Sequence, residues 1–121
     1  MKMLTITKVT TIIFIISFSV SAQVQNLAIV INGLKDPGSI SIVNINQTNI
    51  KKAVKNDIIT IGSTPNDVQV QHNLAYVVNT YSNNIQIINL LEQNSAGEIS
   101  VGSGTLPEKI AFVDSFKAYV T

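Results

Sequence analysis

Cysteine, tryptophan and arginine are absent from the 121 residues of this chain, and it has only three prolines and one histidine. Without cysteine the chain can form no disulfide, thiolate metal site or cysteine nucleophile. A lone histidine cannot build the usual transition-metal cluster either. With no arginine and a formal net charge of +1, the chain lacks the electrostatic footprint of nucleic-acid binding, and we expect no nucleic-acid partner.

Charged residues are also scarce, at 12%, against 45% hydrophobic residues. This balance excludes a solvated, disordered chain. The length allows one small domain at most.

The first residues have the layout of a secretory signal. Lys2 and Lys8 precede an apolar run over residues 9–20, and small residues follow it. We therefore predict a signal peptide over Met1–Ala22 with cleavage before Gln23. The apolar run is shorter than the roughly 20 residues that cross a bilayer. We expect export to the periplasm, the cell surface or the medium, with no membrane span after cleavage.

Short runs rich in β-branched residues fill the rest of the chain. Leu27–Asn32 and Ile40–Ile45 flank the turn residues Gly33–Gly38 and predict a β-hairpin. A polar interval over Asn46–Asn56 is predicted as a loop, and Asp57–Gly62 as a third strand. The later strands are predicted at Asp67–Gln71, Leu74–Asn79, Ile85–Leu90, Glu98–Gly102, Lys109–Val113 and Lys117–Thr121.

These runs repeat. Leu74–Leu90 resembles Leu27–Ile45, and Lys117–Thr121 opens a third copy. Equivalent alanines and glycines recur about 40–47 residues apart, a spacing typical of propeller blades with four short strands. No helical periodicity of useful length competes with this pattern.

Several of the repeated segments resemble the YVTN repeats of secreted β-propellers. They are AYVVN at Ala75–Asn79, AYVT at Ala118–Thr121, IQIINL at Ile85–Leu90, and the connections ITIGSTP and ISVGSGTLP. The Tyr-Val-Thr-Asn core is only partly kept, since the first copy reads IVIN and the second YVVN. The resemblance covers nearly all of Leu27–Thr121. It implies an all-β fold of four-stranded antiparallel blades, with every strand largely buried on both faces.

The order of the strands predicts an incomplete propeller. The pattern starts at the second strand of one blade and stops at the second strand of another, so we expect residues 23–121 to form about two blades, truncated at the C-terminus. Assembly of several copies into a ring is the alternative.

No catalytic, cofactor-binding or metal-binding residue is predicted. His72 is expected to be a solvated turn residue, and Gly102–Gly104 a turn rather than a phosphate-binding loop. Asp57, Asp67, Glu108 and Asp114 lie at predicted strand ends or turns, which leaves a calcium site open as an alternative. Two surface features remain: an Asn46-Gln47-Thr48 sequon and a lysine cluster at Lys51, Lys52 and Lys55.

The repeats without a catalytic constellation favour an exported, non-catalytic binding scaffold. The strands would supply rigidity, and turns such as Gly33–Gly38 and Thr80–Asn84 would contact a protein or small-molecule ligand. The alternative is a propeller-type hydrolase or oxidoreductase of small metabolites whose catalytic residues lie in further blades.

Overall fold

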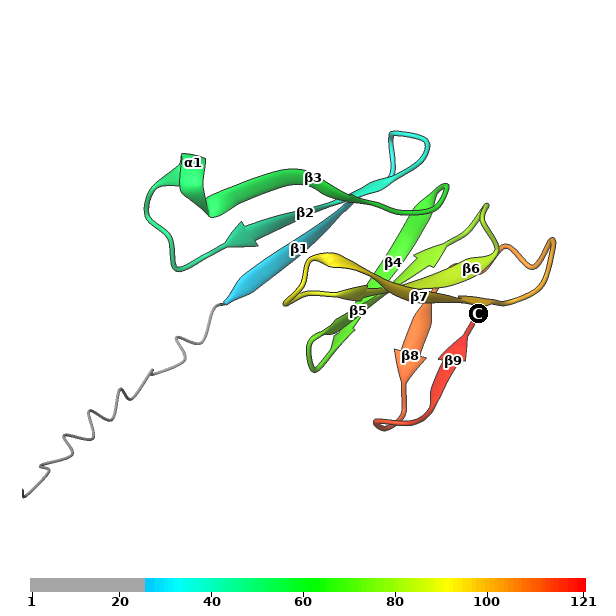
Figure 1. Ribbon diagram of the computed structural model, residues 1–121. Coiled ribbons are helices and arrows are strands. Elements are labelled where there is room, and N and C mark those ends of the chain that lie inside the picture. The colour runs from blue at the N-terminus through cyan, green and yellow to red at the C-terminus, as the bar shows by residue number, and fades with distance from the viewer. Residues whose placement is uncertain (1–25) are drawn as a thin grey trace, which may run out of the picture.

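Residues 26–121 are described by the computed structural model, and almost all of its regular structure is antiparallel β-strand (Figure 1). The predicted signal peptide, Met1–Ala22, lies outside the described residues. No helix within residues 26–121 is long and apolar enough to cross a bilayer. The elements are β1 (Leu27–Asn32), β2 (Ser39–Asn44), α1 (Ile50–Ala53), β3 (Val54–Thr60), β4 (Pro65–Gln71), β5 (Leu74–Asn79), β6 (Asn84–Asn89), β7 (Asn94–Ser100), β8 (Ile110–Phe112) and β9 (Ala118–Val120).

The strands form three sheets that follow one another along the chain: β1-β2-β3, β4-β5-β6-β7 and β8-β9. Neighbouring strands in each sheet are antiparallel. The middle sheet confirms the predicted four-stranded unit, with its strands in the predicted order. None of the three sheets closes on itself within the described residues.

The start of the third strand was predicted wrongly. β3 begins at Val54 rather than Asp57, and the one-turn helix α1 precedes it inside the predicted loop. The side chain of Asn49 accepts a hydrogen bond from the Lys51 N–H, while its carbonyl accepts from Ala53. This N-cap and the burial of Ala53 stabilise the helical turn. The turn was not predicted because its sequence has no apolar periodicity.

Strand β7 also differs from its prediction, because it starts at Asn94 instead of Glu98 and ends at Ser100. Its backbone pairs with β6 along the whole strand, with a register shift between Ile87 and Ile88. All its residues are exposed. The expectation that every strand is largely buried on both faces is therefore wrong for β7, and it is also wrong for β1 and β9, neither of which contains a buried residue. Pairing with β6 outweighs the low β-propensity of its Asn, Ser and Gly residues.

The middle sheet packs against a sheet on each side. Ala75 and Val77 of β5 face the first sheet, whereas Tyr76 and Val78 face the third. This alternation follows from the period of two along a strand. The first interface buries an aliphatic cluster made of Ile40, Ile42, Ile59, Ile61, Ala75, Val77 and Ile88. The second cluster is smaller, and in it the rings of Tyr76 and Phe112 meet edge to face at 4.8 Å.

The connection from β3 to β4 docks onto the middle sheet. The Gly62 N–H donates to the Gln86 side-chain oxygen at 3.2 Å. The Ser63 N–H donates to the Ser82 hydroxyl at 2.8 Å. In the other direction, the Tyr81 N–H donates to the Ser63 carbonyl at 3.3 Å. Beyond the apolar cluster, hydrogen bonds of backbone groups and polar side chains therefore continue the contact between the two sheets to their end.

Gly62 is required in this connection because there is no room for a Cβ. A Cβ there would lie 2.6 Å from the Ser82 hydroxyl oxygen and 2.7 Å from Cγ of Asn79. We expect Gly62→Ala to lower the free energy of unfolding by about 1–3 kcal/mol, through overpacking. Urea unfolding followed by circular dichroism measures this change. Ser103→Ala, at an exposed position of the next connection, is the matched control, and equal effects of the two substitutions would contradict the close approach.

Candidate functional site

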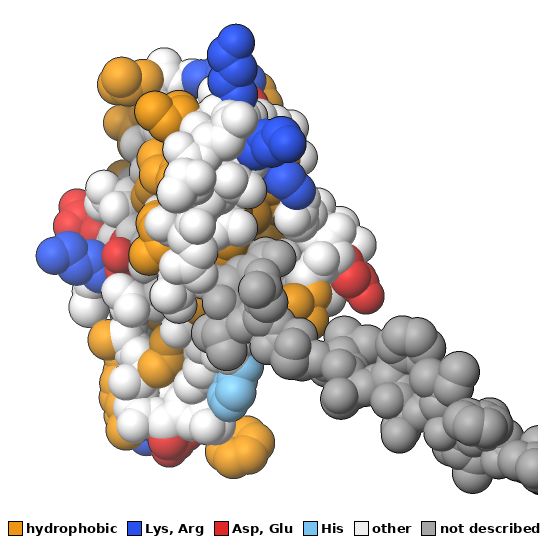
Figure 2. Space-filling model, turned by 90° about the vertical axis from the view of Figure 1, so that its left-hand side faces the viewer, with side chains coloured by type: hydrophobic (Ala, Val, Ile, Leu, Met, Phe, Trp, Pro, Cys, Tyr) orange, Lys and Arg blue, Asp and Glu red, His pale blue; other side chains and the backbone are white. Residues whose placement is uncertain are grey.

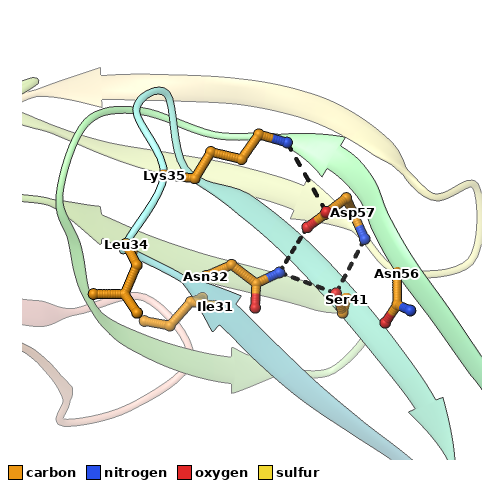
Figure 3. Close-up of a pocket in the computed structure, with 8 residues that line it drawn as sticks. Ile31, Asn32, Leu34, Lys35, Ser41, Asn56 and Asp57 are labelled. Atoms are coloured by element: carbon orange, nitrogen blue, oxygen red, sulfur yellow. Dashed lines mark hydrogen bonds and ion pairs between the residues drawn. The ribbon is translucent and has the colours of Figure 1, made fainter.

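An open cleft of about 460 Å³ lies beside the turn that joins β1 to β2. Figure 3 shows side chains from the end of β1, from β2 and from β3 converging on it. Its lining consists of Ile31, Asn32, Gly33, Leu34, Lys35, Ser41, Asn56 and Asp57.

Asp57 is the centre of the polar network in this cleft (Figure 3). Its carboxylate accepts hydrogen bonds from the Asn32 amide at 2.9 Å and from the Ser39 hydroxyl. The same Asn32 amide donates to the Ser41 hydroxyl oxygen at 3.0 Å. The Lys35 ammonium lies 3.9 Å from the second carboxylate oxygen. Three strand segments and one turn are thus tied to a single carboxylate.

The position of Asp57 results from an irregularity of the sheet. The pairing of β2 with β3 shifts between Ile40 and Ile42, and Asp57 adopts a positive φ of 49°. Aspartate tolerates this left-handed conformation better than most residues. The Asp57 N–H donates to the Ser41 hydroxyl oxygen at 3.0 Å, so a side chain takes over a bond that the regular ladder would make.

These contacts favour the ionised carboxylate. The hydrogen bond from Ser39 is the main reason that the pKa of Asp57 falls below its ordinary value of 3.8, and Lys35 and Asn32 act in the same direction. Desolvation opposes them. Half of the side chain remains exposed, which leaves the carboxylate accessible from solvent.

The middle sheet contains a matching network at the equivalent positions. The Asn79 amide donates to the side-chain oxygens of Asn84 at 3.0 Å and Gln86 at 3.5 Å. The Asn84 amide in turn donates to the Glu98 carboxylate at 2.8 Å. In each sheet the hydrogen bonds run from an asparagine at the end of one strand to an acid two strands along the sheet, directly from Asn32 to Asp57 and through Asn84 from Asn79 to Glu98.

The two equivalent turns each expose one large apolar side chain. Leu34, in the turn after β1, is fully exposed, and Tyr81, at the matching position after β5, is 68% exposed. Lys35 is next to Leu34 and is also exposed. Tyrosine is enriched among the residues that contribute most to binding at protein interfaces.

The residues singled out from the sequence are spread over the molecule. The prediction for His72 is confirmed: it lies exposed in the two-residue turn between β4 and β5, and Figure 2 shows the histidine at the surface. The Asp67 carboxylate accepts from the Ile110 N–H at 3.0 Å and ties β4 to β8. Asp114 accepts from the Phe116 N–H at 2.7 Å. Within residues 26–121, no three His, Asp or Glu side chains lie together as metal ligands.

The remaining predicted features lie at the surface. Gly102 and Gly104 have positive φ angles of 99° and 76° and form a turn, as predicted. The sequon Asn46-Gln47-Thr48 lies in an exposed turn. Lys51, Lys52 and Lys55 are exposed, and the Lys55 ammonium donates to the Gln93 side-chain oxygen at 3.2 Å.

A second hollow, which the sequence did not reveal, lies between the middle and third sheets. This groove of about 380 Å³ is mostly apolar and includes Tyr76, Ile87, Ile99, Phe112 and Phe116. The two strands of the third sheet cover only part of the opposing face of the four-stranded sheet. Because this cover is partial, the side chain of Ile99 on β7 stays half exposed.

Comparison with known proteins adds no relative to this description. No protein-family model matches the chain, and no curated protein matches it. The resemblance to YVTN repeats therefore stays a prediction that depends on the quoted segments.

The acid sensitivity of the cleft can be measured. Because the pKa of Asp57 is lower in the folded chain than in the unfolded one, its contribution to stability is complete above about pH 4 and is lost as the pH falls through the folded pKa. We expect Asp57→Asn to make the free energy of unfolding less dependent on pH below this value. Asparagine keeps the tolerance for positive φ and one acceptor oxygen, so the substitution removes the charge and one of the two acceptor oxygens. Urea unfolding at stepwise lower pH tests this, and parallel pH profiles for both proteins would contradict it.

Proposed function

We propose that this chain is part of an exported, non-catalytic scaffold of the β-propeller type, and that it binds a partner through the turns at one end of its sheets. The observation that carries the proposal is the repetition of one unit. The three strands of the first sheet follow the order of β5, β6 and β7 in the middle sheet, and each sheet has an asparagine at the end of the strand before an exposed turn. Face-to-face packing of such sheets is the arrangement of neighbouring propeller blades. The export itself is inferred from the sequence of Met1–Ala22.

The turns after β1 and β5 are the best candidates for recognition. They lie at the same end of their sheets, since each joins the second strand of a unit to the third. Leu34 and Tyr81 project from them into solvent, while the strands beneath hold the turns in place. The turn after β1 is longer than the turn after β5, whereas the strands that flank the two turns have the same length. A partner with an apolar patch and a group that pairs with Lys35 suits this surface.

Binding to isolated envelopes of the source cells tests the proposal. Fluorescently labelled chain without its signal peptide should bind saturably, and unlabelled chain should compete. We expect the double variant Leu34→Ser/Tyr81→Ser to bind about tenfold or more weakly, the size of effect seen at binding hot spots.

Leu91→Ser is the matched control for this experiment. Leu91 is 73% exposed, in the turn between β6 and β7 at the opposite end of the middle sheet. Equal affinity of the double variant and the unaltered chain would refute a role for the two turns, and so would an equal loss with Leu91→Ser.

A further inference from the structure

A third, smaller hollow of about 170 Å³ lies between the first and middle sheets, at the end opposite to the turns of Leu34 and Tyr81. One side of it comes from α1 and the first sheet, and the other from the turn between β6 and β7. Its lining consists of Leu27, Ile42, Asn44, Lys52, Ala53, Lys55 and Gln93. Four of these residues have side-chain NH groups that donate hydrogen bonds, and none is an acid.

The two lysines of the hollow have no carboxylate to pair with. Within residues 26–121 the one ion pair joins Lys35 to Asp57, in the cleft at the other end. The Lys55 ammonium donates to the Gln93 side-chain oxygen at 3.2 Å, which is a neutral acceptor. Figure 2 views the molecule from the side of α1 and shows lysine side chains gathered in its upper part. Two ammonium groups that line one small hollow repel each other, and an anion between them offsets this repulsion.

The two amide side chains are oriented so that their NH₂ groups remain available. The Asn44 side-chain oxygen accepts from the Asn46 N–H at 3.1 Å, and the Gln93 oxygen accepts from Lys55. Neither NH₂ group donates a hydrogen bond to another described residue. Asn44 and Gln93 are half-buried. Positive charge and free NH donors, with no carboxylate, are the combination that binds an oxyanion.

We propose that this hollow binds a phosphate group, carried either by a small solute or by a phospholipid headgroup. Lys52 and Lys55 supply the charge, and the NH₂ groups of Asn44 and Gln93 supply further hydrogen bonds to the phosphate oxygens. A phosphate monoester has three acceptor oxygens and about 1.5 to 2 negative charges at pH 7, which match the two lysines. The site does not involve the turns of the proposed function, so either proposal can fail while the other holds.

Phosphate binding to the chain without its signal peptide tests the site. Inorganic phosphate and glycerol phosphate are titrated by calorimetry at constant ionic strength. Lys52→Gln should weaken the binding about tenfold or more, because a charge-assisted hydrogen bond is lost. Lys51→Gln is the matched control, since Lys51 is the neighbouring exposed lysine and does not line the hollow. An equal loss with both substitutions would overturn the proposal, because it would show attraction to the lysines in general.

Asn44→Asp is a second, nearly isosteric variant. The aspartate keeps the oxygen that accepts from the Asn46 N–H and replaces the NH₂ group by a charged oxygen. We expect it to abolish phosphate binding and to raise the urea midpoint in phosphate-free buffer, because its carboxylate takes the place of the anion beside the lysines. The raised midpoint shows that the variant is folded. Unchanged phosphate affinity of this variant would contradict the proposed site.

Vesicles distinguish the two sources of the phosphate group. Co-sedimentation is measured with phosphatidylcholine vesicles that contain or lack phosphatidic acid. Binding that requires phosphatidic acid, is lost with Lys52→Gln and is kept with Lys51→Gln supports a lipid headgroup. Binding of the solutes without binding to either vesicle supports a small phosphate. Failure of all these probes to bind, or equal binding of chloride and phosphate at the same ionic strength, would overturn the proposal.

Discussion

The burial of Ala75, Val77 and Ile88 against the isoleucines of β2 and β3 is the contact on which the rest of the structure depends. A single antiparallel sheet has two faces and cannot remove both from water by itself, and small sheets are marginal in isolation. The middle sheet meets this constraint by packing the first sheet on one face and the third on the other. Its side chains alternate accordingly along β5, and the small Ala75 allows close approach of the first sheet.

Hydrogen bonds at the β3–β4 connection complete this contact and fix how the two sheets are oriented against each other. Gln86 accepts from the Gly62 N–H and donates to the Thr60 carbonyl at 3.4 Å, so one amide side chain binds the backbone on either side of Ile61, at the start of the connection. Asn79 is fully buried, and its side-chain oxygen has no partner within the described residues. An unsatisfied buried oxygen costs about 1–3 kcal/mol. The amide group of Asn79 offsets part of this cost through its bonds to Asn84 and Gln86.

The sequence predicts the strands well wherever local pattern and tertiary burial agree. β1, β2, β5 and β6 are β-branched runs between turn residues, and they lie within one residue of their predicted bounds. The one-turn helix α1 was missed because it depends on the capping of Asn49 rather than on periodicity. The bounds of β7 were predicted wrongly because its polar residues have no apolar pattern. Only the pairing with β6 defines where this strand begins and ends.

The cleft around Asp57 illustrates the second limit of prediction. Its members come from β1, β2 and β3, and a register shift together with a positive φ brings them together. Neither feature has a strong local signal. The signal that was available is the similarity of the two segments: Asn32 and Asn79 both end a strand that precedes an exposed turn, so a role found for one predicts the neighbourhood of the other.

At Tyr81, the contact between the sheets and the exposed surface involve different parts of one residue. Its backbone N–H is bound by the Ser63 carbonyl of the docked connection, yet its ring remains largely exposed. The turn thus holds the neighbouring module through its main chain and presents a different side chain to solvent, and Leu34 takes the same place in the first unit. Because main-chain bonds do not depend on the side chain, the repeat can change the residue at the tip without weakening the contact between sheets. In the proposed binding scaffold, the residue at the tip of the turn can therefore change while the interface between the sheets is kept.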